Sequence, residues 1–171
     1  MHDPRVHILN QDAWTFIRST PEKYDLVVSD LPDPNEFSVA KLYTIEFYHL
    51  LREKMTDRSV MVTQATSPYF ARNAYWCIQQ TMKEVFPSVD SYQVYVPSFG
   101  IWGFHIAGTS INSRSSDNTI PASNRYVKPG IPATLFSFDS DTAPVATQPN
   151  RLDNQQLVQY YNESWKQWNE P

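Results

Sequence analysis

Glycine is scarce in this chain, with only four glycines among 171 residues. Loops that wrap closely around a phosphate or a nucleoside normally depend on clustered glycines, because glycine lets the backbone approach such a group and adopt positive φ. None of the four glycines forms a loop of this kind. The sequence therefore contains no glycine-rich nucleotide cradle of its own.

Cysteine is equally rare, and the histidines are scattered. The single cysteine, Cys77, cannot form an internal disulfide, so we expect a core thiol in a reducing compartment. The four histidines show no ligand spacing and have no cysteine pair to join them. The sequence predicts no metal site.

Positive charge and long apolar runs are also missing. The net charge is -4, from 14 basic and 18 acidic side chains, which gives no electrostatic reason to expect a nucleic-acid partner. No apolar run approaches the length that spans a membrane, and no signal peptide is recognisable. We therefore expect a cytoplasmic chain with no membrane span.

Hydrophobic residues make up 41% of the chain and aromatic residues 14%, enough for a real core. Apolar periodicity alternates between the spacings of strands and helices. This alternation predicts an α/β fold that ends in an antiparallel edge pair. The strands are expected at residues 6–9, 23–29, 59–63, 91–96 and 103–107, and the helices at 12–19, 38–53 and about 67–85.

Composition divides the chain into three parts, residues 1–108, 109–130 and 131–171. The middle part is rich in Ser, Asn, Thr and Pro, which predicts a long polar loop, either a lid or a poorly ordered segment. The last part is an extension that ends in an amphipathic helix, with Asp153 and Gln156 as a capping box. We expect its aromatic stripe to pack on this domain or on a partner subunit.

The clearest candidate site follows the strand at 23–29. Asp30 and Asp33 come directly after the apolar run 26–28, which is typical of a strand buried on both faces of a parallel sheet. Pro32 and Pro34 force the chain out of the sheet there. In open α/β sheets ligands bind outside the carboxyl ends of the strands, so both acids would point into a crevice. Paired carboxylates suit a cationic ligand or a general base with a tuned pKa. The alternative is that both acids only cap the next turn and helix.

Six motifs follow one another along the chain. They are Asn10-Gln-Asp-Ala13, Asp30-Leu-Pro-Asp-Pro34, Leu42-Tyr-x-x-Glu-Phe-Tyr48, Gln64-Ala-Thr-Ser-Pro68, Val96-Pro-Ser-Phe-Gly-x-Trp-Gly-Phe104 and Asn150-Arg-Leu-Asp-Asn-Gln155. In this order they resemble the spermidine synthase family of polyamine aminopropyltransferases. The likeness is closest to the branch of thermospermine synthases and of bacterial forms with a membrane-spanning N-terminal region.

The resemblance implies a partial Rossmann-like three-layer sandwich, of the S-adenosylmethionine-dependent methyltransferase type, that lacks its N-terminal nucleotide-binding half. It also implies transfer of an aminopropyl group from decarboxylated S-adenosylmethionine, a co-substrate, to a polyamine such as putrescine, with no further cofactor. By the same resemblance Asp30 is the catalytic base, and Asp33 and Gln64 bind the amine substrate. Asp12, with Ala13 beside it, binds the adenine of the nucleoside.

The family also has an upstream half, with a glycine-rich loop and a ribose-binding carboxylate. This chain begins after both, so we expect a homo-oligomer or completion by an upstream half. Pro97 stands about where the family has a substrate-contacting tyrosine, and Tyr95 and Trp102 are candidates to replace it.

Three functions stay open from the sequence. The paired acids favour an aminopropyltransferase over a methyltransferase that uses intact S-adenosylmethionine. The missing glycine-rich half favours the third possibility, a non-catalytic interaction module.

Overall fold

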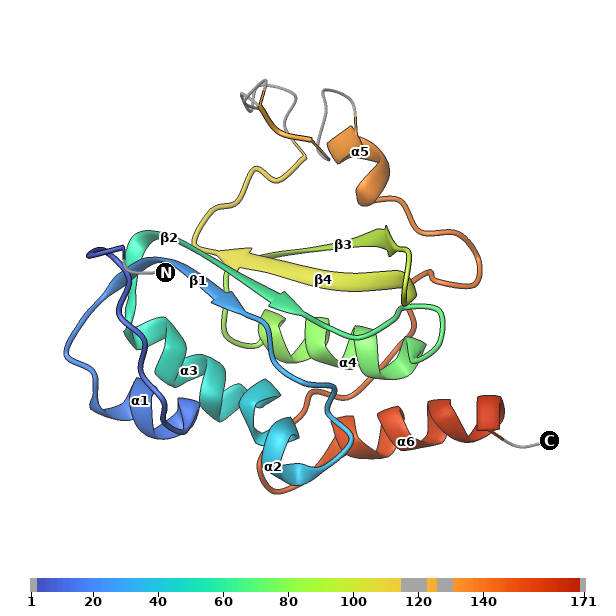
Figure 1. Cartoon of the computed structure of the whole chain (residues 1–171). Coiled ribbons are helices and arrows are strands. Elements are labelled where there is room, and N and C mark those ends of the chain that lie inside the picture. Colours follow the sequence, from blue (N-terminus) through green and yellow to red (C-terminus); the bar gives the residue numbers. More distant parts are fainter. Residues whose placement is uncertain (1–2, 115–122, 126–130, 170–171) are drawn as a thin grey trace.

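The computed structural model describes residues 3–114, 123–125 and 131–169, and Figure 1 shows their arrangement. The strands are β1 (Tyr24–Ser29), β2 (Met55–Gln64), β3 (Ser88–Val96) and β4 (Gly100–Gly108). The helices are α1 (Ala13–Ser19), α2 (Phe37–Ala40), the 3-10 helix η1 (Lys41–Tyr43), α3 (Ile45–Glu53), α4 (Arg72–Lys83), α5 (Ile131–Leu135) and α6 (Gln156–Asn169).

The four strands form one mixed sheet in the order β1-β2-β4-β3. β1 and β2 are parallel, with Val28 opposite Val62, so a crossover connection joins them. β3 and β4 form an antiparallel hairpin, and β4 also lies antiparallel to β2. The predicted α/β class with an antiparallel pair at one side of the sheet is therefore confirmed.

Helices α3 and α4 cover one face of the sheet, and α6 packs on α4 (Figure 1). Side chains alternate between the two faces of a strand, so Met61 and Ala107, which are opposite each other, both point to this covered face. Both are fully buried, as is Ile78 from α4. α1 joins the same layer through Trp14, whose ring stacks on Phe47 with centroids 5.5 Å apart.

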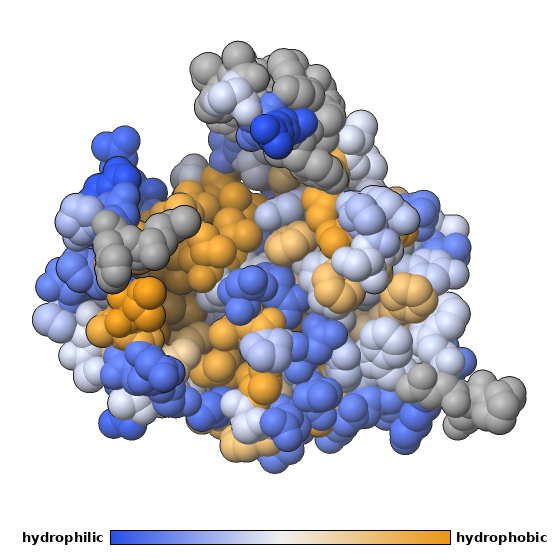
Figure 2. All heavy atoms as spheres, viewed as in Figure 1, coloured by the Kyte–Doolittle hydropathy of each residue, from blue (hydrophilic) through white to orange (hydrophobic). Residues whose placement is uncertain are grey.

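The opposite face of the sheet is open at β1. Leu26 and Val28 are 61% and 67% exposed, and Figure 2 shows apolar surface gathered over this part of the sheet. The prediction that the run 26–28 is buried on both faces is therefore wrong for this chain. The described residues form two of the three layers of a complete sandwich, because no described helix lies over Leu26 and Val28.

Two other element predictions need correction. Residues 6–9 form no strand, because they have no neighbouring strand to pair with among the described residues, and Ile8 is 88% exposed. The predicted helix 38–53 is three helices, since Thr44 has an extended backbone. Its hydroxyl oxygen accepts a hydrogen bond from the N–H of Phe47 (3.3 Å) and so begins α3.

The α4 and hairpin boundaries also differ. The helix predicted at about 67–85 begins later, because α4 starts at Arg72. Ser67 accepts hydrogen bonds from the N–H groups of Tyr69 and Phe70 and so caps a turn that precedes the helix. The hairpin turn is shorter than predicted. It covers residues 97–99, and β4 starts at Gly100, where φ is +76°.

The start of α6 does not use the predicted capping box. Asn154, rather than Asp153, accepts a hydrogen bond from the N–H of Gln156 (3.1 Å). Asn150, which is buried, accepts from the N–H of Leu157 (3.1 Å) and donates to the carbonyls of Ala40 and Tyr43. This asparagine ties the start of α6 to the connection between β1 and α3.

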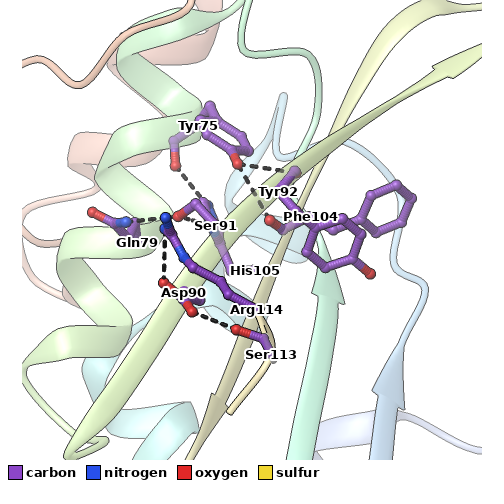
Figure 3. Close-up of polar contacts among 9 residues, drawn as sticks. All are labelled: Tyr75, Gln79, Asp90, Ser91, Tyr92, Phe104, His105, Ser113 and Arg114. Carbon is purple, nitrogen blue, oxygen red and sulfur yellow. Dashed lines mark hydrogen bonds and ion pairs between the residues drawn. The ribbon is translucent and has the colours of Figure 1, made fainter. Parts of the chain in front are cut away.

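The first residues of the polar segment 109–130 are held against β3. Asp90 accepts a hydrogen bond from Ser113 and pairs with Arg114 at 3.1 Å (Figure 3). The Arg114 guanidinium also lies 5.2 Å from the ring centre of Phe136. Residues 115–122 and 126–130 lie outside the described residues, so the choice between a lid and a poorly ordered segment stays open.

A buried polar network joins β3, β4 and α4 (Figure 3). The His105 ring meets the Tyr75 carbonyl oxygen at 2.9 Å through Nε2 and the Ser91 hydroxyl at 2.8 Å through Nδ1. Because a carbonyl can only accept, Nε2 carries the proton and Nδ1 accepts from Ser91. Gln79 donates to the same hydroxyl at 2.6 Å. Burial lowers the pKa of His105 to about 3, so the ring is neutral at physiological pH.

Replacing His105 should change how stability depends on pH. Between about pH 6.5 and pH 3 the unfolded chain binds a proton at this histidine and the folded chain does not, so the free energy of unfolding falls as pH falls. The contribution is at most about 1.4 kcal/mol per pH unit. Urea unfolding between pH 4 and pH 7 should show a shallower slope for His105→Gln.

The exposed His49 on α3 provides the matched control. His49→Gln removes a histidine without touching the network and should keep the wild-type slope. An equal slope in wild type and His105→Gln would contradict the assignment of His105 as a buried neutral ring.

Candidate functional site

The end of β1 opens into an apolar hollow of about 340 Å³ on the uncovered side of the sheet. Two aromatic rings form part of its wall, those of Tyr92 and Phe104, which stack with centroids 5.2 Å apart. Asp30, the first residue after the strand, is exposed and lines the hollow. The other lining residues are Val28, Ser29, Val62 and Gln64. Apolar walls with one carboxylate suit an aliphatic cation.

Asp33 is half-buried, unlike Asp30. The Tyr161 hydroxyl donates a hydrogen bond of 2.8 Å to its Oδ2. The other oxygen, Oδ1, is buried and has no hydrogen-bond partner among the described residues. Burial raises the pKa of the Asp33 carboxyl, and the hydrogen bond from Tyr161 and the neighbouring Gln64 amide oppose that rise.

Both acids lie close enough to the Tyr43 hydroxyl to affect it. Burial raises the pKa of Tyr43, and the charges of Asp33 and Asp30 raise it further. The Tyr43 hydroxyl in turn lies 3.2 Å from the Pro32 carbonyl oxygen, to which it donates. The structure therefore brings the two predicted acids to one place, with one exposed and the other half-buried.

Gln64, at the end of β2, is buried, and its amide group makes all of its hydrogen bonds to other groups of the protein. Its Nε2 donates to the Leu31 carbonyl and to the Tyr43 hydroxyl (3.0 Å). Its Oε1 accepts from the Thr66 N–H (3.0 Å) and from the Trp102 indole (3.1 Å). Thr66 adopts a positive φ of 62°, a costly conformation for a β-branched residue. The geometry makes Gln64 an anchor of the loop that carries the acids, and its direct contact with substrate stays a prediction.

Tyr95 and Trp102 are the two residues proposed to replace the substrate-contacting tyrosine of the family. Of these two, Trp102 contacts the Gln64 side chain. Tyr95 is 66% exposed, and Pro97 lies in the hairpin turn. Trp102 contacts Gln64 through its indole nitrogen and Phe99 through its ring, with centroids 5.2 Å apart. Trp102 thus supports the acid loop from β4.

Asp12 and Ala13 do not line the hollow. Asp12 caps α1, because its Oδ1 accepts from the Thr15 N–H at 2.9 Å, and its Oδ2 pairs with Lys41 at 3.3 Å. The backbone hydrogen bond from Thr15 and the contact with Lys41 hold the pKa of the Asp12 carboxyl below its usual value. Ala13 is half-buried beside it. The nucleoside role predicted for these two residues is untested.

Two partners in the site were missed by sequence reasoning, Tyr43 and Tyr161. Tyr43 lies in one of the motifs that carry the family resemblance, and Tyr161 lies in the aromatic stripe of the C-terminal helix. No local pattern shows which acid a distant tyrosine will reach. Among the described residues, no three His, Cys, Asp or Glu side chains gather closely enough to hold a metal ion. None of the helices in the described ranges combines the length and the apolar character that crossing a bilayer requires.

The fold and the site together define a Rossmann-like α/β domain with acids and an apolar hollow at the carboxyl ends of its parallel strands. The family described as "Spermine/spermidine synthase domain" matches residues 1–118. The chain belongs to this family.

Curated relatives match nearly the whole chain. Polyamine aminopropyltransferase 2 of Ralstonia nicotianae is 39% identical over 163 residues, which are 95% of this chain and 32% of that protein. The polyamine aminopropyltransferase of Leptospira interrogans is 38% identical over 165 residues, which are 96% of this chain and 33% of that protein. The chain therefore spans about one third of the length of the curated relatives it matches.

Solved structures share the fold. A spermidine synthase in complex with the transition state analogue AdoDATO matches with a TM-score of 0.67 and 19% identity, over 80% of this chain and 49% of that chain. Spermidine synthase from Thermotoga maritima matches with a TM-score of 0.61 and 16% identity, over 80% and 47% of the two chains. The predicted methyltransferase-like fold is confirmed.

Removing the Gln64 amide should destabilise the chain. Gln64→Met keeps a similar volume but removes the acceptor of the buried Thr66 N–H and of the half-buried Trp102 indole N–H. We expect the free energy of unfolding to fall by about 2–4 kcal/mol, measured by urea denaturation.

Gln80→Met on α4 is the control, because its amide has one contact, 3.3 Å long, with Glu84 at the surface. That change should cost less than about 0.5 kcal/mol. Equal losses in the two variants would show that Gln64 does not anchor the loop.

Proposed function

We propose that the chain acts in polyamine biosynthesis, in the transfer of an aminopropyl group from decarboxylated S-adenosylmethionine to a polyamine such as putrescine. The observation that carries this proposal is the pair of unequal acids at the end of β1. Asp30 lines the apolar hollow and Asp33 lies half-buried three residues further on. The names of the relatives, polyamine aminopropyltransferases, support the same assignment.

The residue types fit this reaction. A protonated amine is no nucleophile, so the acceptor must lose a proton before it attacks the carbon beside the sulfonium. Asp30 is the base that takes this proton. A C–N bond forms, the C–S bond breaks, and methylthioadenosine leaves with the electron pair on sulfur. Desolvation against the apolar wall and the nearby sulfonium charge both lower the pKa of the ammonium, which makes the proton transfer easier.

Asp33 is the anchor for the amine in this proposal. Its buried Oδ1 lacks a donor within the described part of the chain, and an ammonium supplies both hydrogen-bond donors and the opposite charge. The apolar wall formed by Val28, Val62 and Phe104 suits the methylene chain between two amino groups. Holding nucleophile, carbon and sulfur in line then supplies much of the rate enhancement.

Asp12 and Ala13 are proposed to contact the adenine. The Asp12 carboxylate keeps acceptor capacity, since an ionised carboxylate has about four acceptor positions and three are used in the structure. The cytoplasmic location, the homo-oligomer or upstream partner half, and the absence of a further cofactor stay predictions.

One observation favours a second candidate, the interaction module. Leu26 and Val28 expose apolar surface on an open sheet face, and such surface marks an interaction site in soluble domains. An interaction module would need neither acid, whereas the transferase needs both. No observation on this chain favours the methyltransferase.

Asp30→Asn should slow transfer strongly. The full chain would be incubated with decarboxylated S-adenosylmethionine and putrescine, and spermidine and methylthioadenosine would be quantified by mass spectrometry. Loss of the general base should lower kcat by about 10²-fold or more.

The control is Asp25→Asn, which changes an exposed acid of the same strand whose Oδ1 accepts from the Thr56 hydroxyl at 2.8 Å. It should keep wild-type turnover. A wild-type chain that makes no spermidine, or an Asp30→Asn variant as fast as Asp25→Asn, would reject the proposal.

A further inference from the structure

Helix α6 lies beyond residues 1–118, the part of the chain that the family match covers. It nevertheless reaches the acid loop. The Tyr161 hydroxyl donates to Asp33 at 2.8 Å, and the Asn162 amide lies 3.5 Å from the Asn35 carbonyl oxygen. Two consecutive residues of α6 therefore contact the segment that follows β1.

The rotation of α6 is fixed on both sides of Tyr161. At its start, buried Asn150 accepts from the Leu157 N–H and donates to the Tyr43 carbonyl. Further along, the Trp165 ring stacks on Phe70 with centroids 5.8 Å apart and an angle of 17° between the planes. With its neighbours fixed, Tyr161 is held toward Asp33.

The hydrogen bond from Tyr161 makes the two Asp33 oxygens unequal. Oδ2 has a donor, whereas Oδ1 is buried without one among the residues described. An unpaired buried carboxylate oxygen is costly, and a ligand that brings a donor and a positive charge removes that cost. Because Oδ2 is already satisfied, the ligand is directed to Oδ1.

We propose that Tyr161 is a positioning residue for the acceptor amine, which orients the Asp33 carboxylate so that Oδ1 receives the ammonium group. This inference rests on the proposed function and assigns a part of the amine site to the C-terminal helix. Tyr161 does not touch the reacting atoms. It acts through Asp33, so it should set the affinity for the amine and leave the affinity for the nucleoside unchanged.

The test compares two neighbouring tyrosines of α6. Tyr161→Phe removes the hydroxyl that reaches Asp33, and Tyr160→Phe removes a hydroxyl that accepts a hydrogen bond of 3.4 Å from the Gln148 N–H. Both rings stay in place. The dissociation constants of putrescine, spermidine and methylthioadenosine would be measured by calorimetry on the full chain, with KM and kcat measured for transfer.

We expect Tyr161→Phe to raise the dissociation constant and the KM of the amine about tenfold, the effect of one hydrogen bond to a charged group. The dissociation constant of methylthioadenosine and kcat should change less than twofold. Tyr160→Phe should leave the three dissociation constants, KM and kcat within twofold of wild type. A defect that was only structural would move amine and nucleoside affinity together.

A second measurement needs no α6 variant, in case Tyr161→Phe does not fold. In wild-type protein with ¹³C-labelled aspartate, putrescine should shift the Asp33 carboxyl resonance, identified by its loss in Asp33→Asn. No shift on amine binding would overturn the inference.

The outcomes separate the two proposals. Transfer by wild type with equal amine affinity in both tyrosine variants overturns the role of Tyr161 and leaves the transferase standing. Amine binding that depends on Tyr161, without transfer, supports the amine site and rejects the transferase. A wild-type chain with neither binding nor transfer rejects both.

Discussion

The hydrogen bonds of the Gln64 side chain are the constraint on which the acid loop depends. Residues 30–34 leave the sheet, and two of them are prolines with no N–H to offer a neighbouring strand. The loop is instead held by side chains, and Gln64 joins it to Tyr43 on one side and to Trp102 on the other. Because this amide is buried, each of its bonds is shielded from competition with water. These shielded hydrogen bonds hold the loop in place, and the loop in turn sets the positions of both carboxylates.

Two buried polar groups show contrasting uses of burial. Both ring nitrogens of His105 make hydrogen bonds within the protein, so the ring joins the hairpin to α4. Neither nitrogen is left to bind a ligand. Asp33 has one oxygen with a hydrogen-bond donor and one without a donor in the ranges that the structure describes. A satisfied group adds rigidity, while an unsatisfied acid retains attraction for a cation. Burial therefore adds rigidity to the sheet at His105 and leaves an oxygen that attracts a cation in the acid loop at Asp33.

Sequence reasoning placed β1, β2, α4 and the β3–β4 hairpin, because their apolar spacing is local information. It failed for residues 6–9, since a strand needs a neighbour that periodicity cannot supply. It also missed the break at Thr44, where a local hydrogen bond overrides an apolar spacing that continues across it. Asp30 and Asp33 could be predicted as site residues because the prolines beside them mark where the strand ends. The contact of Tyr161 with Asp33 could not be found, since nothing near either residue indicates the other.

The distance along the chain between Asp33 and Tyr161 has a consequence for the order of folding. Their hydrogen bond closes a loop of 128 residues, and closing a long loop costs entropy that local contacts do not. During synthesis the sheet and α4 emerge long before α6, so they can pack while the carboxylate of Asp33 is still free to rotate. The acid geometry is then set only when the final helix docks. A chain that lost this helix would retain most of its core but would hold Asp33 without a fixed orientation.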